Sequence, residues 1–236
     1  MTESLPQLNL SFDADDSPLS DLSSDDDFAV KEKDSAQCPY CKRPVDGDAL
    51  HKFSKGAYMT LRMQRRFCTQ HKEDEARAEW KAKGYPEIDW ARLDARISSH
   101  YDYLEGILRG GASHYKDALA REVKEGRKRN LAKADFNSTP GYYGEKGFRA
   151  MQEGIFDRFS ELLRERTVKD GLVSARGYSL YVQAVLVPER AVRLVMEDMG
   201  VGAEGARKIL EESTWVGELL CEDEGDVVDE NDENLF

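Results

Sequence analysis

The sequence predicts a mainly α-helical domain with few or no strands, set between two disordered acidic tails. Apolar residues in the central region recur every three or four positions, as they do on the buried face of a helix. Acidic residues concentrate towards both ends of the 236-residue chain. No apolar run approaches the eighteen or so residues of a membrane span, so we expect no contact with a membrane.

The two tails are residues 1–37 and 221–236. The first holds ten acidic and two basic side chains and the second holds eight acidic and no basic ones, so each has a net charge of −8. Their few apolar side chains cannot offset the entropy lost on ordering, which predicts disorder. They either keep the protein soluble or screen a basic surface against unwanted partners. The remaining residues, 38–220, carry a net charge of +4.

Two pairs of metal-binding residue types open the central region. Two residues separate Cys38 from Cys41, and two separate Cys68 from His71. A Cys₃His set completes a closed tetrahedral site, which favours Zn²⁺ over copper or iron. A redox dithiol would leave Cys68 and His71 without a role. We therefore expect a structural Zn²⁺ cofactor in a knuckle over residues 38–71.

The first helices follow from residue type and spacing. Residues 72–83 are good helix formers and end at a Gly-Tyr-Pro stop signal. Apolar spacing predicts one amphipathic helix over residues 90–108, with Asp89 as its N-cap. Residues 113–133 are charged throughout and predict either an exposed helix or a loose connection.

The second half of the domain is also helical. A Gly-rich turn over residues 139–144 leads into a helix whose apolar stripe runs from Phe148 to Leu162. Residues 178–187 are β-branched and aromatic, so they form a short strand or a buried helical turn. Pro188 opens a helix that Gly200 closes. A short helix over residues 203–212 completes a single domain over residues 38–220.

The sequence offers little chemistry for catalysis. It lacks the GxSxG, HExxH and GxxxxGK[ST] patterns. Of its four histidines, His71 is a candidate metal ligand, His51 lies inside the zinc loop, and His100 and His114 stand among charged or polar neighbours. We therefore expect a protein that is not an enzyme and has no small-molecule substrate. Gly141–Gly147 indicates a tight, aromatic-packed turn; its alternative, an anion site, lacks the Lys-Ser/Thr ending of a phosphate loop.

Basic and aromatic clusters are candidate contacts for nucleic acid or a protein partner. Arginines crowd just before Cys68, and a second basic cluster spans residues 121–133. A solvated helix face is the alternative explanation, since acids lie close to both. The candidate contact residues are Arg62, Arg65, Arg66, Arg127, Lys128, Arg129, Tyr142 and Tyr143.

Six short motifs, in order, resemble the C-terminal domain of the fungal restriction of telomere capping protein 4 family. The resemblance covers roughly residues 38–220 and implies a nuclear and cytoplasmic protein linked to telomere capping, without an assigned biochemical activity. The segment before the first motif is shorter than the N-terminal regions of many family members. The motifs are Cys38-Pro39-Tyr40-Cys41, Phe67-Cys68-x-x-His71, Tyr85-Pro86-x-Ile88-Asp89-Trp90, Pro140-Gly141-Tyr142-Tyr143-Gly144-x-x-Gly147, Val185-Leu186-Val187-Pro188-Glu189 and Glu197-Asp198-Met199.

Two functions follow as expectations. The first is a non-enzymatic adaptor that binds protein partners and influences telomere capping. The second is direct DNA binding through the edge of the zinc knuckle and the cluster at residues 121–133.

Overall fold

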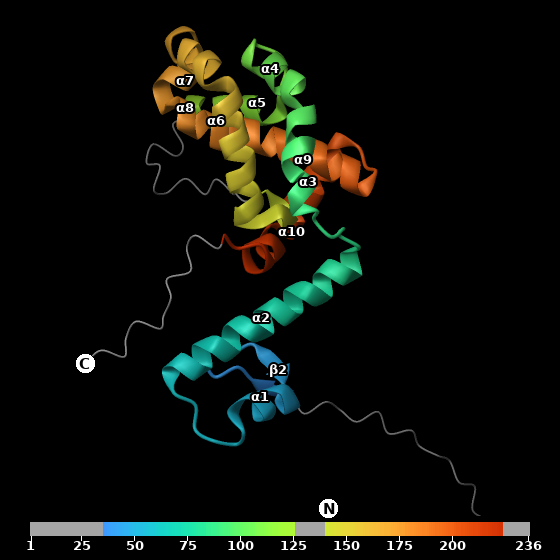
Figure 1. The fold of residues 1–236 in the computed structure, drawn as a ribbon. Coiled ribbons are helices and arrows are strands. Elements are labelled where there is room, and N and C mark those ends of the chain that lie inside the picture. Colours follow the sequence, from blue (N-terminus) through green and yellow to red (C-terminus); the bar gives the residue numbers. More distant parts are fainter. Residues whose placement is uncertain (1–34, 126–139, 224–236) are drawn as a thin grey trace, which may run out of the picture.

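A computed structural model describes residues 35–125 and 140–223 of the chain. In Figure 1, a small N-terminal module lies at one end and a larger helical body at the other, and a long helix connects them. The predicted disorder of the tails concerns residues that are almost all outside the described ranges. The candidate contacts Arg127, Lys128 and Arg129 also lie outside them.

The N-terminal module contains the strands of the described chain. Strand β1 (Ser35–Gln37) pairs antiparallel with β2 (Pro44–Asp46), and Ala36 lies opposite Val45. Helix α1 (Gly47–Ser54) follows, capped by the Asp46 side chain, which accepts hydrogen bonds from two backbone N–H groups. A small buried cluster holds the module together, formed by Cys38, Met59, Phe67 and Cys68.

Helix α2 (Leu61–Lys83) connects the module to the body. It ends at Gly84, as the stop signal predicted, but it begins eleven residues before the predicted start at residue 72. The missed turns contain arginines on one face and the buried Phe67 and Cys68 on the other. Because those apolar residues pack on the small module rather than on a long stripe, their periodicity in the sequence is weak.

The body begins with α3 (Trp90–Ser99), α4 (Tyr101–Leu108) and α5 (His114–Lys124). The Asp89 side chain accepts a hydrogen bond from Arg92 N, so the predicted N-cap is confirmed. The single helix predicted over residues 90–108 is wrong, because the chain breaks at His100. Apolar residues on both sides of this break still reach the same core, so spacing alone could not reveal it.

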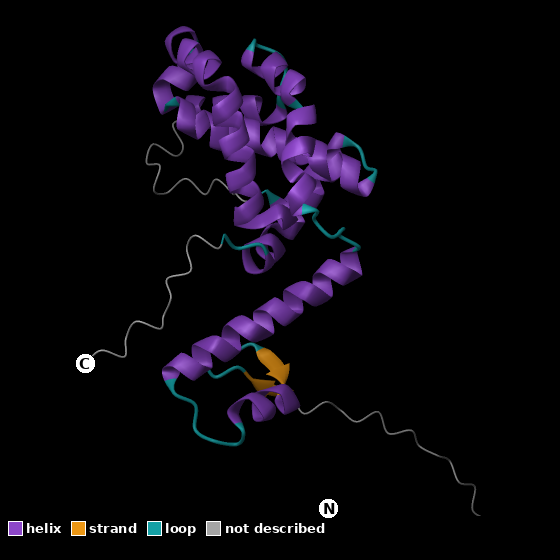
Figure 2. Ribbon diagram, in the orientation of Figure 1, coloured by secondary structure: helices purple, strands orange, loops and turns teal. Residues whose placement is uncertain are grey.

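The rest of the body is helical throughout, and a mainly α fold is confirmed (Figure 2). The strand alternative for residues 178–187 is wrong: this buried segment forms helical turns, including a π turn. Gly200, at φ 63°, ends the helix that contains Pro188, as predicted. The elements are η2 (Gly141–Tyr143), α6 (Gly144–Lys169), α7 (Gly171–Arg176), α8 (Tyr178–Tyr181), η3 (Val182–Leu186), α9 (Val187–Met199) and α10 (Ala203–Leu220).

Helix α10 is eight residues longer than the predicted helix over residues 203–212. The Ser213 hydroxyl donates to Ile209 O, 2.6 Å away, and accepts from Tyr142 N at 2.9 Å. Ser213 and Thr214 therefore continue the helix instead of ending it: Ser213 also bonds to η2, and Thr214 Oγ1 donates to Leu210 O within α10. The predicted end rested on residue types that often cap helices.

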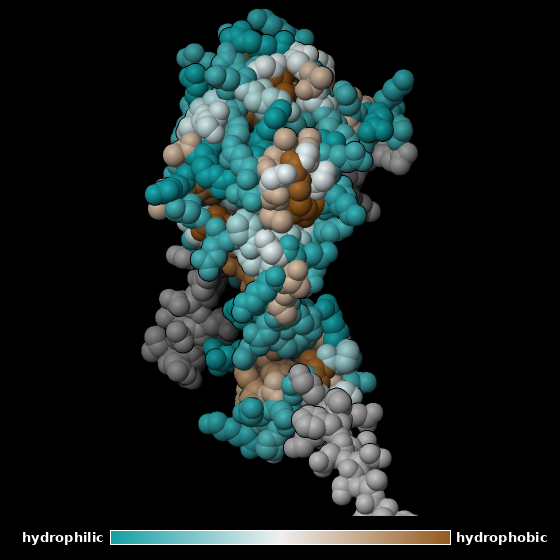
Figure 3. Space-filling view, turned by 90° about the vertical axis from the view of Figure 1, so that its right-hand side faces the viewer, coloured by the Kyte–Doolittle hydropathy of each residue, from teal (hydrophilic) through white to brown (hydrophobic). Residues whose placement is uncertain are grey.

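Two hydrophobic clusters form the interior of the described chain. The larger one fills the body between α3, α6, α9 and η3, and the smaller one lies in the module. No helix among the described residues is both long and apolar enough to cross a membrane. On the face in Figure 3, hydrophilic residues cover most of the surface and hydrophobic areas are small.

Candidate metal centre

Four side chains from two segments converge in the N-terminal module. Their donor atoms, from Cys38, Cys41, Cys68 and His71, all lie within 4.8 Å of one another. The first two come from the turn between β1 and β2, and the other two lie on one face of α2. The sequence-predicted set is thus brought together by the fold, and it can hold one metal ion.

The turn that carries the first two cysteines has the hydrogen bonds of a metal knuckle. Lys42 N donates to Cys38 O, and Cys38 N donates to Arg43 O, both at 2.9 Å. Lys42 takes a left-handed conformation, with φ of 63°, and this reverses the chain directly after Cys41. The two thiols therefore face α2, where Cys41 Sγ lies 3.3 Å from His71 Nε2.

The donor set fits a divalent cation. Burial raises the pKa of Cys41, but hydrogen bonds from the Arg43 N–H and from neighbouring side chains outweigh it and lower the pKa to about 6. Burial and the adjacent Cys41 and Cys38 thiols raise the pKa of Cys68 to about 11. Ionisation of one cysteine thus disfavours ionisation of its neighbour, because the two thiolates repel each other. A bound cation would offset this repulsion.

A carboxylate supports the histidine, and sequence analysis missed it. Glu75 Oε1 lies 3.4 Å from His71 Nδ1, and Arg43 Nη1 lies 3.4 Å from the other oxygen, Oε2. A carboxylate beside the distal ring nitrogen orients a histidine so that the opposite nitrogen faces the metal. The sequence could have predicted this contact, because Glu75 follows His71 by four residues and so lies on the same face of the helix.

The metal module is strongly basic. Residues 35–72 contain eight Lys and Arg and two Asp, for a net charge of +6. The described residues of the body, 73–125 and 140–223, contain twenty-seven acidic and twenty basic residues, for a net charge of −7. The small net charge of residues 38–220 is therefore the sum of a basic module and an acidic body.

Three candidate contact residues lie on one exposed face of α2. Arg62, Arg65 and Arg66 have the i, i+3, i+4 spacing of helical neighbours, and all three are exposed. The metal-facing residues Cys68 and His71 lie on the opposite side of the same helix. The metal centre thus fixes the helix whose outer face presents the arginines.

The other two candidate contacts, Tyr142 and Tyr143, are buried. Both hydroxyls donate to Asp198 Oδ2, that of Tyr142 at 2.7 Å. Arg96 Nη2 lies 2.7 Å from the other oxygen, Oδ1. Burial and the Asp198 charge raise the pKa of Tyr143. Asp198 therefore joins η2, α3 and α9, and its oxygens are occupied by structural donors.

A comparison with protein families identifies the body. Residues 109–222 match the model of the RTC4-like domain. This segment is similar to that domain, and we call residues 109–222 the RTC4-like domain. No curated protein and no solved structure matches the chain.

The RTC4-like domain runs from the end of α4 through α10, so it includes the Gly-Tyr-Tyr-Gly turn and Asp198. The cysteines and the histidine of the metal centre lie before it. An RTC4-like domain is consistent with a telomere-related role.

The expectation that Tyr142 and Tyr143 form a surface patch is wrong. Neither ring is exposed, because Tyr142 stacks between Tyr85 and Tyr143 and both hydroxyls bond to Asp198. The aromatic-packed turn expected for Gly141–Gly147 is confirmed.

Proposed function

We propose that this protein binds nucleic acid through the basic face of its metal module, as part of a telomere-related role. The observation that supports it best is the exposed arginine face of α2, held in place by the metal-binding residues behind it. Phosphate contacts supply most of the affinity for DNA, and arginine suits them because its guanidinium donates several hydrogen bonds. A nuclear location belongs to this proposal.

Other features of the module favour the same ligand. The first turn of α2 contains no acidic residue, so the positive end of the helix dipole adds to the arginine charge. Tyr58, in the loop before α2, is 90% exposed, and Tyr40 lies on the metal-binding turn and is 49% exposed. Exposed aromatic rings beside basic residues can stack on unpaired bases.

We assign Zn²⁺ to the metal centre. Three thiolates and one imidazole are the ligands of closed structural zinc sites, and four protein donors leave no position for a reacting water. Zinc would neutralise charge and fix the turn and α2 relative to each other. In this proposal the metal has a structural role, and the arginines contact the nucleic acid.

The test measures DNA binding by the full chain and by a variant with Arg62→Gln, Arg65→Gln and Arg66→Gln. Fluorescence anisotropy with labelled single- and double-stranded DNA gives the affinity at several salt concentrations. We expect weaker binding, and a slope of log affinity against log salt that is reduced by about two to three, because each lost phosphate contact removes about 0.9.

The matched control removes the same charge from exposed positions further along the chain, Lys81→Gln, Arg164→Gln and Lys169→Gln. Binding by this control should stay close to that of the unmodified chain. An equal loss in both variants, or no loss in the arginine variant, would overturn the proposal. Tyr58→Ala should weaken binding to single strands more than binding to double strands.

A non-enzymatic adaptor remains the second candidate function. The net charge of −7 on the described body disfavours nucleic acid there and leaves the RTC4-like domain to protein partners. In this arrangement the module contacts nucleic acid and the body contacts protein. Loss of the nucleic-acid proposal would leave the adaptor as the whole function.

A further inference from the structure

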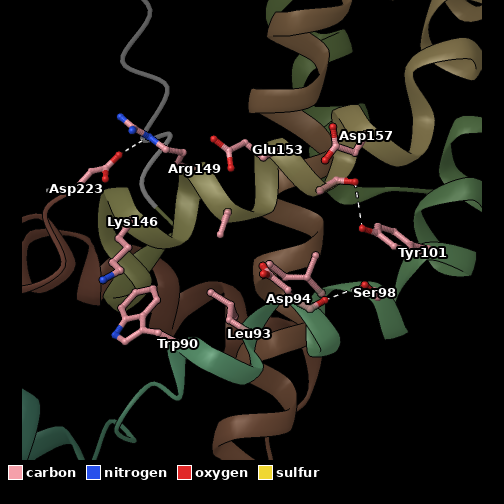
Figure 4. Close-up of a pocket in the computed structure, with 13 residues that line it drawn as sticks. Trp90, Leu93, Asp94, Ser98, Tyr101, Lys146, Arg149, Glu153, Asp157 and Asp223 are labelled. Atoms are coloured by element: carbon pink, nitrogen blue, oxygen red, sulfur yellow. Dashed lines mark hydrogen bonds and ion pairs between the residues drawn. The ribbon is translucent and has the colours of Figure 1, made fainter. Parts of the chain in front are cut away.

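A groove of about 480 Å³ runs between α3 and α6 in the helical body (Figure 4). Leu93 and Ile97 of α3 and Ala150 of α6 give it an apolar lining. Gly154 has no side chain, and its carbonyl accepts a hydrogen bond from Tyr101 Oη at 3.1 Å. These small residues keep the space between the two helices open. Helices α3 and α6, which line the groove, lie in the body, whereas the N-terminal half of α2 lies in the module (Figure 1).

Carboxylates line both sides of this groove. Asp94 comes from α3, and Glu153 and Asp157 come from successive turns of α6 (Figure 4). All three are exposed, and none forms an ion pair or a side-chain hydrogen bond with another described residue. Together they place a negative charge of three above an apolar lining.

The basic residues of the groove gather at one end and are already engaged. Arg149 forms an ion pair with Asp223, and Lys146 Nζ lies 5.0 Å from the centre of the Trp90 ring. Asp223 matches the charge of Arg149, whereas Lys146 keeps its charge beside the Trp90 ring. The four acidic and two basic residues that line the groove give it a net charge of −2.

Glu153 and Asp157 stand one helical turn apart on α6, and Asp94 comes from α3. Among the described residues, the Cys₃His set of the module is the group whose donor atoms meet closely enough for one metal ion, and the groove carboxylates form no such group. Nucleic acid would be repelled by the same charge. The remaining cationic ligand is a polypeptide with basic side chains.

We propose that the groove binds a basic peptide segment of a partner protein. Lysine and arginine side chains lay their aliphatic stems on apolar surface and keep the charged head at a carboxylate. The partly exposed Trp90, Tyr101 and Ala150 offer apolar surface to the stems above the buried Leu93 and Ile97, and the carboxylates of Asp94, Glu153 and Asp157 receive the heads. The volume is that of a site for a few side chains. The proposal is independent of nucleic-acid binding by the module.

The first experiment selects a phage-displayed library of random dodecapeptides on the full chain. We expect enrichment of peptides that carry at least two basic residues next to an apolar one. An enriched peptide is then synthesised with a fluorescent label, and its affinity is measured by anisotropy. Selection without enrichment of basic peptides would overturn the proposal.

Charge reversal tests the site itself. We expect Asp94→Lys with Glu153→Lys to weaken peptide binding by about tenfold or more, because like charges then face each other. The matched control, Asp117→Lys with Glu211→Lys, changes the net charge equally at exposed positions outside the groove. Its affinity should stay within about twofold, as for other surface charges. Circular dichroism checks that both variants keep their helices.

Complementary peptides distinguish a specific site from general attraction. A peptide with its arginines changed to glutamate should bind the Asp94→Lys, Glu153→Lys variant better than it binds the unmodified chain. Displacement of the basic peptide by spermidine at an equal concentration of positive charge would show that any polycation binds, and would overturn the peptide assignment. Equal losses in the groove variant and its control would overturn it as well.

Discussion

At the scale of single residues, Asp198 connects two of the sequence motifs in the folded protein, the Gly-Tyr-Tyr-Gly turn and the Glu-Asp-Met motif. It accepts hydrogen bonds from Tyr142 and Tyr143 and forms an ion pair with Arg96, so that motifs more than fifty positions apart meet at one carboxylate. Its side chain is 11% exposed. A buried charge held by three donors is costly to replace, since each donor loses its acceptor.

We expect Asp198→Asn to lower the free energy of unfolding by about 2–4 kcal/mol, because the amide keeps one acceptor oxygen and removes the charge opposite Arg96. Urea-induced unfolding followed by circular dichroism measures the change. The control is Glu197→Gln, whose side chain is 44% exposed and also contacts Arg96. Because the Glu197 carboxylate is exposed, loss of its contacts with Arg96 and His100 should cost about 1 kcal/mol. Equal losses would refute the assigned role of Asp198.

The sequence predicted the candidate metal ligands and an aromatic-packed turn, but not the residues that bury its tyrosines. The ligand pairs are local patterns, since Cys38 with Cys41 and Cys68 with His71 each need only one turn of chain. The burial of Tyr142 depends on Asp198 and on Ser213, which lie far along the sequence. No local pattern contains that information.

At the scale of elements, the contact between η2 and α10 decides the shape of the RTC4-like domain. Gly217 of α10 faces the backbone of η2 so closely that a Cβ there would lie 2.0 Å from Gly141 O. A helix can approach another backbone this closely only where a glycine stands at the crossing. The second glycine at this contact, Gly144, has a φ of 61°.

We expect Gly217→Ala to destabilise the protein by about 3 kcal/mol or more, because the methyl group forces backbone atoms apart. Gly106→Ala is the matched control: Gly106 lies in the last turn of α4, and a Cβ there would meet no atom within 4 Å. There the substitution should stabilise the helix by about 0.5–1 kcal/mol. Thermal and urea unfolding measure both. Destabilisation of similar size in both variants would mean that the crossing is not the cause.

Helix ends were predictable from the sequence where a glycine in the left-handed conformation stops the helix. They were not predictable where contacts with other parts of the fold decide the end. Gly84 and Gly200 both take φ values near 65° directly after a helix, so residue type predicts the stop. The start of α2 and the last turns of α10 depend on contacts with the module and with η2. The propensity of Ser213 and Thr214 for caps therefore misled the prediction.

At the scale of the whole molecule, the two clusters differ greatly in size. The body buries a cluster of twenty-six residues, whereas the module buries four, two of which are metal-binding cysteines. So small a cluster offsets little of the chain entropy of some forty residues, and we infer that metal binding supplies the difference. The sequence predicted one domain over residues 38–220 because helical spacing says nothing about which helices share a core.

We expect removal of the metal to unfold the module and leave the body folded. With a zinc chelator, hydrogen exchange of amides in residues 35–72 should accelerate by orders of magnitude, because opening no longer breaks metal bonds. Amides of α6 and α9 should keep their protection, since their core does not contain the metal centre. Cys41→Ser should reproduce this pattern without chelator, whereas Cys221→Ser should retain one metal ion per chain and full protection. Unchanged exchange in residues 35–72 would show that the module folds without metal, and equal loosening of α6 would show that module and body unfold as one unit.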